Sequence, residues 1–556
     1  MGKLVLNNAS TPSAEANSPH ATAISLLLAI AVGALFFYIM LPFGPWAQSD
    51  TVDYVQAARH LVQGRGLTVY QSDGSLMPLS HFPPGYPLAL ATAMALGLNW
   101  VAAARLVSAL AAGLLTFLLA RSASSALRRP LAALLALPVI ALLPVARLLA
   151  GAMSEPPYFV LQAIWVLALW RALSAQTRRA RMRWLVAAGF AVGLGTLIRY
   201  AGLHAWLTLA VAILLLPRAE IPAGAIASYA PPAALFGAWK AWLALRHAPA
   251  IGRLNFHLAD WLTAAPKFFA QTAQSFILPW GAPLPLWAVW LFWAGIIALT
   301  VLAVFALLRS PRGGAWFLGG IWLAEGLASF PFMLASYAAF QPTPALDWRI
   351  YAPAALALAM GLLLWGGAAL DALAEGKLWR GSWLARWQEK CRGRGYFTAA
   401  ALLGIALLAA PTPQHTTLKS VHSTGLGYTS QEWYTLRKEL LPRVAAFPPQ
   451  MPIVSNARGG LILWIDRPAA PFASLHNHTL PPAPMGTVQN DPAHRLVRRG
   501  AAFVLIWADP ARQDLAWWGN PKRMIARLID GLHICYQTPF GGIYFYTPPP
   551  KRYCQH

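Results

Sequence analysis

The chain has 556 residues, of which 57% are hydrophobic and 11% charged, and its mean hydropathy is +0.49. A water-soluble protein of this size needs more charged surface to cover its core, so the composition predicts an integral membrane protein. It excludes collagen-like and disordered chains. The three cysteines, Cys391, Cys535 and Cys554, are too few for a disulfide scaffold, and pairing of Cys535 with Cys554 in an oxidising compartment stays open.

The net charge is +24, from 43 Lys plus Arg against 19 Asp plus Glu. Such a charge would indicate nucleic-acid binding in a soluble protein. In a membrane protein the cations of short loops mark the cytoplasmic side instead. We therefore expect no nucleic-acid partner. A secondary role of these cations is to hold anionic membrane lipids.

A polar tail, residues 1–20, is expected to be disordered, and the apolar run that follows is predicted to be a retained first span. Apolar runs of sufficient length predict a transmembrane domain over 21–410 with about eleven spans. The predicted spans are 21–43, 100–120, 131–150, 156–172, 184–198, 201–217, 221–245, 284–308, 315–338, 350–372 and 396–410.

The positive-inside rule fixes the orientation of these spans. With the N-terminus inside, 17 Lys and Arg residues fall in cytoplasmic loops. This requires that 84–98 lies at the outer interface without crossing, and that 184–217 forms two short helices broken at Arg199, Tyr200 and Gly202. The C-terminal region is then outside.

The region 411–556 is richer in proline and polar residues and is predicted to be a soluble, extracytoplasmic α/β domain. Short strand-like runs alternate there with helix-like stretches. The strands are expected at Pro452–Ser455, Leu461–Ile465, Ala502–Trp507 and Gly542–Tyr546, and the helices at Ser430–Val444 and Pro521–Leu532.

Acidic residues of the membrane part favour the predicted outer side. Because ionisable groups near a membrane are costly, this asymmetry indicates an outward-facing acidic site, although topology alone explains part of it. The six acids at outer positions are Asp50, Asp53, Asp73, Glu155, Asp260 and Asp347.

The first outer loop, 44–99, is the most informative stretch. Asp50 follows Ser49 and precedes a helical pattern of residues on one face, Tyr54, Ala57, Ala58 and Leu61. Asp50 is therefore predicted at a helix N-terminus, where the helix dipole stabilises a carboxylate. A simple capping role is the alternative.

Three elements in this region occur together in one known group of proteins. They are Asp50 with Tyr54, Pro83-Pro84 with Tyr86, and Arg105 with Ser108. In order and approximate spacing, residues 45–205 resemble the GT-C membrane glycosyltransferases, in the branch of bacterial dolichyl-phosphate-mannose-protein mannosyltransferase-like proteins and the lipid A aminoarabinose transferase. Beyond this stretch, the multi-span layout and the soluble tail agree with that branch.

Three later elements are also similar to that branch: Ser154-Glu155-Pro-Pro-Tyr158, the short-helix turn around Arg199, and Asp347-Trp-Arg349-Ile-Tyr351. There are two departures. Thr51 stands where many members have a second acid, and the element around Pro84 lacks the lysine of the aminoarabinose enzyme. These departures affect the prediction of which sugar and which acceptor are used more than the prediction of the reaction class.

The resemblance implies an inverting transfer of a sugar from a polyprenyl-phosphate donor to an acceptor hydroxyl of a lipid, glycan or protein at the outer membrane face. Asp50 would be the general base, and Glu155 would orient the acceptor, bind a sugar hydroxyl or help place a metal. Arg199 and Arg349 are the best candidates for neutralising the lipid phosphate. The substrate-binding residues would be Tyr54, Asp53, His81, Tyr86, Arg199, Lys267, Asp347 and Arg349.

A structural alternative stands beside these roles, with Arg349 pairing with Asp347 and Arg199 with Glu155 only to balance charge. Glu325 lies inside an apolar run. A neutral carboxyl in the core and a functional carboxyl are equally good interpretations of this residue. No cysteine and histidine spacing typical of a metal site is present, so we expect no metal cofactor, with a divalent ion left open.

Two other functions compete with the transferase. One is a transporter or flippase for lipids or sugars, which should show inverted repeats and charges near mid-membrane. The other is a non-catalytic relative that only binds the lipid carrier. The expected location is the inner (plasma) membrane, with the site and the C-terminal domain on the periplasmic or extracellular side.

Overall fold

A computed structural model describes residues 19–71, 73–248, 253–254, 258–277, 284–341, 348–374, 394–409, 413–471, 483–487, 489, 491–549 and 551–554. The chain divides into two compact units. Unit 1 is residues 1–37, 107–149 and 154–418, and unit 2 is residues 38–106, 150–153 and 419–556. Unit 2 thus combines the first predicted outer loop with most of the predicted C-terminal domain, although these are far apart in the sequence.

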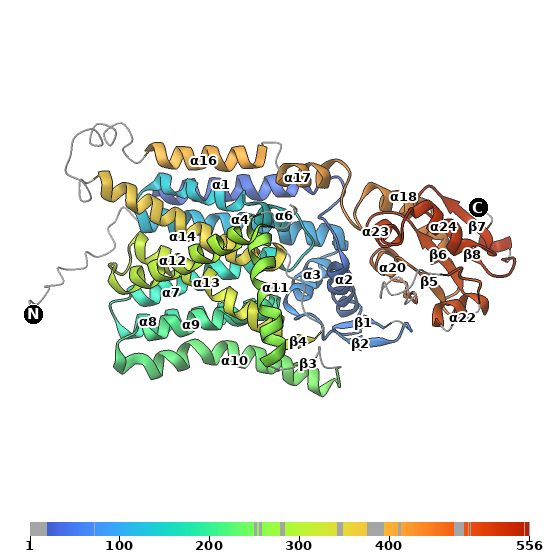
Figure 1. The fold of residues 1–556 in the computed structure, drawn as a ribbon, viewed down its shortest axis with the longest axis horizontal. Helices are drawn as coiled ribbons and strands as arrows, with labels where there is room; N and C mark the ends of the chain where they lie inside the picture. The colour runs from blue at the N-terminus through green and yellow to red at the C-terminus, as the bar shows by residue number, and fades with distance from the viewer. Residues whose placement is uncertain are drawn as a thin grey trace, which may run out of the picture. The chain divides into compact units, whose positions relative to one another are not determined.

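Unit 1 is a bundle of helices that lie side by side (Figure 1). Its short strands β3 (Arg253–Leu254) and β4 (Phe340–Gln341) pair in the antiparallel sense. The helices, two of which extend into unit 2, are α1 (Pro19–Ile39), α4 (Trp100–Leu127), η2 (Pro130–Leu135), α5 (Ala136–Ile140), α6 (Leu143–Leu149), α7 (Glu155–Ser174), α8 (Arg178–Ile198), η3 (Tyr200–His204), α9 (Ala205–Leu214), η4 (Arg218–Glu220), α10 (Ile221–Leu245), α11 (Leu258–Ile277), α12 (Leu286–Arg309), α13 (Ala315–Ala339), α14 (Trp348–Ala374) and α16 (Arg394–Ala409).

Each of the eleven predicted spans overlaps one or more helices. Among the described residues, seven helices are long and apolar enough to cross a membrane: α1, α4, α7, α8, α12, α13 and α14. An eighth span results if Pro130–Ile140 and Leu143–Leu149, which meet at 83°, count as one. The multi-pass helical architecture agrees with the sequence, whereas eleven spans and the inside location of the N-terminus stay predictions.

Small residues bring the helices of unit 1 close together. A Cβ on Gly33 of α1 would lie 3.3 Å from the carbonyl oxygen of Ala109, and a Cβ on Gly361 of α14 would lie 2.9 Å from that of Gly319 in α13. Helices in membranes associate largely through such close packing, because lipid provides little hydrophobic driving force between them. The glycines therefore allow these helix pairs to pack backbone against backbone.

The predicted break between α8 and α9 is confirmed. Helix α8 ends at Ile198, Arg199 is extended with φ −145° and ψ 132°, and η3 begins at Tyr200. A Cβ on Gly202 would lie 2.8 Å from the backbone nitrogen of Thr196, so only glycine lets the turn fold back on α8. The break leaves Arg199 at the end of a helix.

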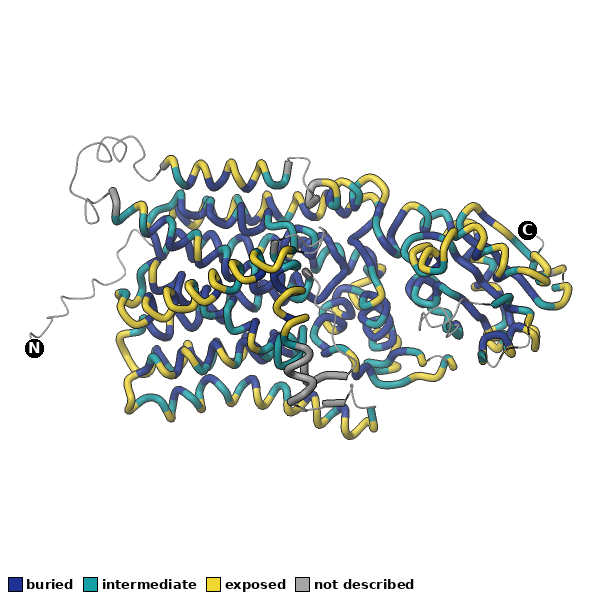
Figure 2. The backbone as a smooth tube through the Cα atoms, in the orientation of Figure 1, coloured by how far each residue is buried: buried dark blue, intermediate teal, exposed yellow. Residues whose placement is uncertain are grey.

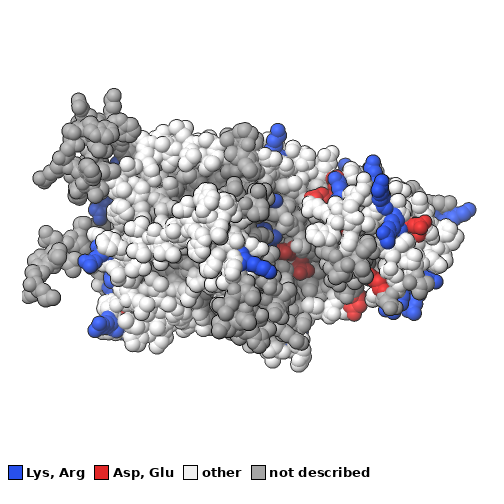
Figure 3. Space-filling model, in the orientation of Figure 1, with Lys and Arg blue, Asp and Glu red and all other residues white. Residues whose placement is uncertain are grey.

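Basic side chains gather at one end of the helical unit (Figure 3). They come from the end of α4, the facing ends of α7 and α8, η4 and the end of α12. Two of them are paired: Arg181 contacts Glu220 at 2.6 Å, and Arg129 contacts Asp371 at 2.7 Å. The clustering agrees with the loop assignment made from the sequence.

Unit 2 is an α/β unit with a four-stranded sheet of order β5-β6-β8-β7. Strands β5 (Ile453–Ser455) and β6 (Ala502–Ile506) are parallel, while β8 (Gly541–Phe545) is antiparallel to β6 and to β7 (His533–Thr538). Its other elements are α2 (Ser49–Val62), the hairpin β1 (Thr68–Tyr70) and β2 (Leu76–Pro78), α3 (Gly85–Ala95), α17 (Pro413–Ser423), which begins in unit 1, α18 (Gln431–Glu439), α19 (Leu441–Ala445), α20 (Arg458–Ile465), α22 (Pro492–Arg498), α23 (Ala511–Ala516), α24 (Pro521–Ile529) and α25 (Lys551–Cys554).

Two hydrophobic clusters pack on the four-stranded sheet of this unit, and strand β6 contributes to both. Buried segments of the backbone are dark blue in Figure 2. Ala502, Val504 and Ile506 belong to one cluster, and Phe503 and Leu505 to the other. Because successive side chains of a strand point to opposite faces, β6 is buried on both sides. It therefore reads as a continuous apolar run in the sequence.

Three of the four predicted strands are confirmed, as β5, β6 and β8. The strand predicted at Leu461–Ile465 is wrong, because these residues form the last turns of α20. Helix α3 spans 11 residues. At about 1.5 Å per residue it is too short to cross the roughly 30 Å hydrocarbon core, which agrees with the prediction that 84–98 does not cross.

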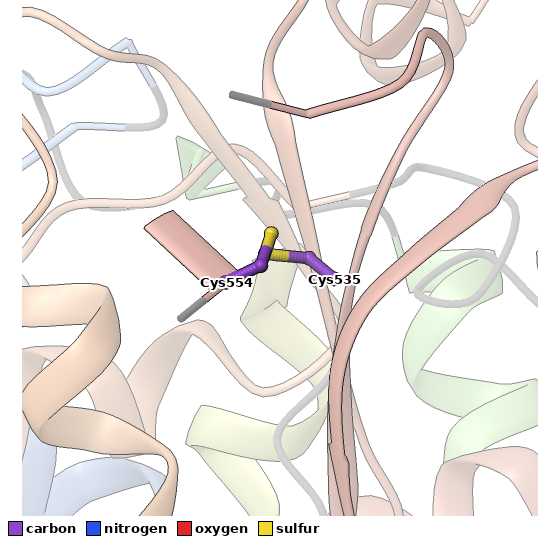
Figure 4. Close-up of a disulfide and its surroundings, with 2 residues drawn as sticks. All are labelled: Cys535 and Cys554. Carbon is purple, nitrogen blue, oxygen red and sulfur yellow. A yellow bond between two sulfur atoms is a disulfide. The ribbon is translucent and has the colours of Figure 1, made fainter. Parts of the chain in front are cut away.

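Cys535 of β7 and Cys554 of α25 form a disulfide, with their Cα atoms 5.0 Å apart (Figure 4). The bond ties the last helix of unit 2 to the edge of the sheet. The pairing that the sequence left open is therefore present, whereas Cys391 lies outside the described residues.

Candidate functional site

Unit 1 contains a buried carboxylate shared by two arginines. Glu155 begins α7, with Ser154 as the preceding cap residue, and its side chain is 1% exposed. Arg199 Nη1 lies 2.6 Å from Glu155 Oε1, and Arg349 Nε lies 3.8 Å from the same oxygen. Arg199 Nη1 also donates to the Ser154 hydroxyl at 3.4 Å. Residues separated by up to 194 positions thus meet at one carboxylate.

This cluster of Glu155, Arg199 and Arg349 has one negative and two positive charges. The two arginines have side chains only 14% and 17% exposed. Burying ions is costly unless they are paired or hydrogen-bonded, and Glu155 supplies such a partner to both arginines. A guanidinium binds phosphate well through paired N–H donors, so the cluster has the chemistry of a phosphate site.

An apolar groove of about 500 Å³ lies in the same unit. It is lined by α9, α11, α12 and α13, with Leu207, Phe268, Trp293, Ile297 and Phe330 among its walls. Thr300 is the one lining side chain with a hydroxyl, and that hydroxyl donates to Ile296 O at 2.8 Å. A groove of this kind accepts a hydrocarbon chain and offers little to a sugar.

One hydrophobic cluster contains groove residues and chain neighbours of the two arginines. Phe268, Ile296 and Phe330 of the groove belong to this cluster, and Ala201 and Ile350 pack against it. Ala201 follows the break after α8 and Ile350 lies at the start of α14, close in the chain to Arg199 and Arg349. The cluster therefore connects the groove walls to the segments that contain the two arginines.

Glu325, left open by the sequence, is paired in the core. Its Oε1 lies 2.7 Å from His204 Nε2, and its Oε2 accepts the Thr208 hydroxyl at 2.6 Å. His204 Nδ1 lies 2.7 Å from Ala201 O, which only accepts, so this nitrogen donates. One proton is then shared between His204 and Glu325. Gln162 Nε2 donates to Glu325 at 3.2 Å, so the network joins α7, η3, α9 and α13.

Unit 2 has a polar cavity of about 650 Å³. One side of the cavity is formed by the start of α2 and the β1–β2 hairpin. The other side is formed by the C-terminal part of the unit. The lining residues include Gln48, Ser49, Asp53, Tyr70, His81, Tyr428, Asn456, Arg458 and Asp514. Asp53 thus faces this cavity, whereas Asp50 does not line it.

The start of α2 is built as the Ser-Asp pattern predicted. Gln48 is the cap residue, and its backbone N–H donates to Thr51 Oγ1 at 3.0 Å. The Thr51 hydroxyl donates in turn to Ala152 O at 3.0 Å, which fixes the first turn of the helix. Asp50 lies in that turn and accepts from Ser49 Oγ at 3.3 Å. Thr51 is therefore a capping residue.

Asp53 has an altered acidity. Burial raises its pKa from 3.8 to about 6, against the opposing charges of His81 and Arg458, and the charge of Asp50 adds to the rise. A carboxyl with a pKa near 6 takes up and releases protons close to neutral pH. Burial also raises the pKa of Tyr428, so that its hydroxyl stays protonated in the same cavity.

The other predicted residues occupy varied places. Tyr54 and Tyr86 are buried, with their ring centroids 5.1 Å apart, and they pack in the core of unit 2. His81 is exposed at the cavity and packs edge-on against Phe82. Lys267 is exposed on α11. Asp347 lies outside the described residues, so its predicted pairing with Arg349 does too.

Sequence reasoning missed the cavity residues from the C-terminal region, Arg458 above all. Arg458 donates to Tyr70 O and is followed by two glycines that allow close packing. A Cβ on Gly459 would lie 2.8 Å from Val52 Cγ2, and one on Gly460 would overlap the Trp433 ring. In the sequence, the two consecutive glycines after Arg458 were the feature that could have indicated this part of the cavity.

Among the described residues, no group of three or more His, Cys, Asp or Glu side chains is placed to hold a metal ion. The expectation that the chemistry needs no metal stays a prediction.

The arrangement is that of a membrane protein with a GT-C type fold, in which a helical membrane unit is joined to an α/β unit. No family model and no curated protein matches the chain. Among solved structures it is similar to ArnT from Cupriavidus metallidurans bound to undecaprenyl phosphate, with a TM-score of 0.55, 14% identity, and coverage of 94% of this chain and 98% of that one. The apo structure of ArnT matches with a TM-score of 0.54 and 15% identity, covering 94% and 97%. At this identity the similarity shows the fold, and the fold predicted from the resemblance is confirmed.

Proposed function

We propose that this protein is a membrane glycosyltransferase that transfers a sugar from a polyprenyl-phosphate donor to an acceptor hydroxyl. The observation that carries the proposal is the buried Glu155 carboxylate shared by Arg199 and Arg349, in the same helical unit as an apolar groove. A lipid-linked sugar phosphate has an anion attached to a long hydrocarbon chain. The fold supports the same conclusion, because ArnT binds undecaprenyl phosphate in its structure.

In this proposal the prenyl chain occupies the groove, and its phosphate lies against Arg199 and Arg349. Glu155 holds the two guanidinium groups in place, and their N–H donors bind the phosphate oxygens. When the bond between the sugar carbon and the phosphate oxygen breaks, the departing polyprenyl phosphate gains charge. Fixed cations at that point lower the barrier, because they stabilise charge that develops in the transition state.

The acceptor hydroxyl attacks the anomeric carbon from the face opposite the phosphate, and the configuration inverts. Its proton passes to a carboxylate, which we propose is Asp50 at the start of α2. Asp53, His81 and Arg458 are proposed to bind the acceptor or the sugar in the unit 2 cavity. In the complete reaction, one glycosidic bond forms and one sugar–phosphate bond breaks. The products are the glycosylated acceptor, polyprenyl phosphate and a proton.

We place this reaction at the periplasmic or extracellular face of the plasma membrane. The disulfide between Cys535 and Cys554 supports an oxidising compartment for unit 2. The basic residues at one end of unit 1 support the cytoplasmic location of that end. A reporter fused after His556 should therefore be active only outside the cytoplasm.

The test is a comparison of cell-envelope lipids and glycans by mass spectrometry, in cells with and without the protein. We expect one sugar modification to be lost, to return with the wild-type chain, and to stay absent with Asp50→Asn. The purified chain in vesicles with a polyprenyl-phosphate sugar should then form the same glycosidic bond. Movement of the lipid-linked sugar across the vesicle with no new glycosidic bond would instead establish a flippase.

A further inference from the structure

A second cavity of unit 2, of about 380 Å³, shares no residue with the sites above. It lies where α4, a candidate membrane span, begins. Its lining residues are Arg59, Met94, Asn99, Trp100, Val101, Ala102, Arg105, Tyr434, Arg437 and Trp464. Three of these are arginines and none is acidic.

Arg59 is already engaged by the protein. It donates to Ile462 O at 2.7 Å and to Leu463 O at 2.6 Å, and its Nη1 lies 3.3 Å from Asp466 Oδ1. Burial acts to raise the pKa of Asp466, but His60 and Arg59 outweigh it and lower that pKa, so Asp466 is ionised at neutral pH. Asp466 therefore balances Arg59, and Arg105 and Arg437 are the other two cations that line the cavity.

The backbone adds to this positive field. Asn99 Oδ1 accepts the N–H of Ala102 at 3.0 Å, which fixes the start of the 28-residue helix α4 at the cavity wall. The N-terminal end of a helix has a partial positive charge and favours anions. Arg105, one turn into α4, donates to Leu41 O at 3.0 Å, so its guanidinium is held near this end of the helix.

Aromatic rings lie next to the second arginine. The Arg437 Cζ atom lies over the Trp464 ring, 5.1 Å from its centroid. Trp464 in turn packs edge-on against Trp100 at 5.2 Å and Tyr434 at 5.4 Å. A guanidinium that stacks on a ring by its face keeps its N–H edge available, and that edge matches the paired oxygens of a phosphate.

We propose that this cavity binds a phosphoryl group, through Arg105, Arg437 and the N-terminus of α4. The beginning of a candidate span is the depth at which the phosphates of membrane lipids lie, so an anionic lipid headgroup is one source of this group. A free phosphate or phosphate ester is the other source. The proposal does not depend on the catalytic roles given above, because it concerns other residues and is tested by binding alone.

The experiment uses the full chain purified in detergent and a binding titration followed by intrinsic tryptophan fluorescence. The probes are short-chain phosphatidylglycerol, short-chain phosphatidylcholine and inorganic phosphate. The variant is Arg437→Glu, at an exposed position on α18. The matched control is Arg498→Glu, because Arg498 is also exposed and its guanidinium lies 5.5 Å over the ring of Tyr546.

We expect phosphatidylglycerol to bind the wild-type chain and the Arg498→Glu control alike, and Arg437→Glu to weaken that binding by at least about tenfold, the equivalent of one lost charge-assisted contact. Competition by inorganic phosphate would identify a free phosphoryl group as sufficient, and no competition would identify the lipid headgroup. Equal affinity of Arg437→Glu and wild type for every probe, or an equal loss in both variants, would overturn the proposal. So would equally tight binding of phosphatidylcholine, whose net charge is zero.

Discussion

Unit 1 and unit 2 hold their charged residues in opposite ways. In unit 1 the Glu155 carboxylate is matched by two arginines, and the same unit contains an apolar groove. In unit 2 the carboxyl of Asp53 lines a polar cavity, and burial outweighs the nearby cations, so that its pKa rises to about 6. The first arrangement suits an anion with a hydrocarbon tail, and the second suits the exchange of a proton.

This difference indicates a division of roles in the proposed reaction. Unit 1 would bind the donor and its departing phosphate, and unit 2 would supply the carboxylates for the acceptor side. Each role predicts a different kinetic consequence when it is lost. Donor-side changes should appear mainly in the apparent donor affinity, and acceptor-side changes in turnover and its pH dependence.

The largest effect is expected for Asp50→Asn. The amide cannot accept the acceptor proton, so we expect transfer to fall by about 10³-fold or more, since a general base commonly contributes 10²–10⁴-fold. The measurement is turnover with a polyprenyl-phosphate sugar. Asp73→Asn is the control, because Asp73 is an exposed carboxylate of the same region that contacts Ser75 in the hairpin turn. Near-normal turnover of Asp50→Asn would remove Asp50 as the base.

The disulfide should stabilise unit 2 alone. Cys535 and Cys554 are 19 residues apart. In the chain-entropy model, closing a loop of this size stabilises the folded state by about 3 kcal/mol. Cys554→Ser should therefore increase the rate of hydrogen exchange in the β6–β8 region. Exchange in α12 to α14 should be unchanged. Equal loosening of both units would show that they do not unfold separately.

Arg349→Ala should weaken the donor site. The change removes one of the two guanidinium groups that contact Glu155 and that we propose bind the donor phosphate. We expect the apparent donor KM to rise about 10- to 100-fold, the size of one or two charge-assisted hydrogen bonds, with the acceptor KM little changed. Arg309→Ala, at the exposed end of α12, is the matched control. An unchanged donor KM would contradict the phosphate role.

Much of the fold follows from the sequence, because long apolar runs predict helices and Gly202 beside Arg199 predicts their break. The helical start at Ser49 was also predictable from the Ser-Asp pattern. The strand predicted at Leu461–Ile465 failed because a five-residue apolar run has no period that separates a strand from a buried helix. Residue patterns do not encode long-range contacts. Examples are the approach of Asp53 to Arg458, some 400 residues apart, and the pairing of His204 with Glu325.

The smallest effect concerns the stability of unit 2 and follows from the pKa of Asp53. Because this pKa rises from 3.8 to about 6 on folding, the folded chain holds the proton more tightly than the unfolded chain. The resulting stabilisation is fully present below pH 3.8 and is lost as the pH rises through about 6. Asp53→Asn should therefore raise the melting midpoint at pH 8, where the wild-type carboxyl is ionised against the cost of burial. Below pH 3.8 the two chains should melt nearly alike, since the wild-type carboxyl is then protonated in both the folded and the unfolded state. A gain of the same size at both pH values would show that burial does not set the acidity of Asp53, and would weaken the contrast between the two units.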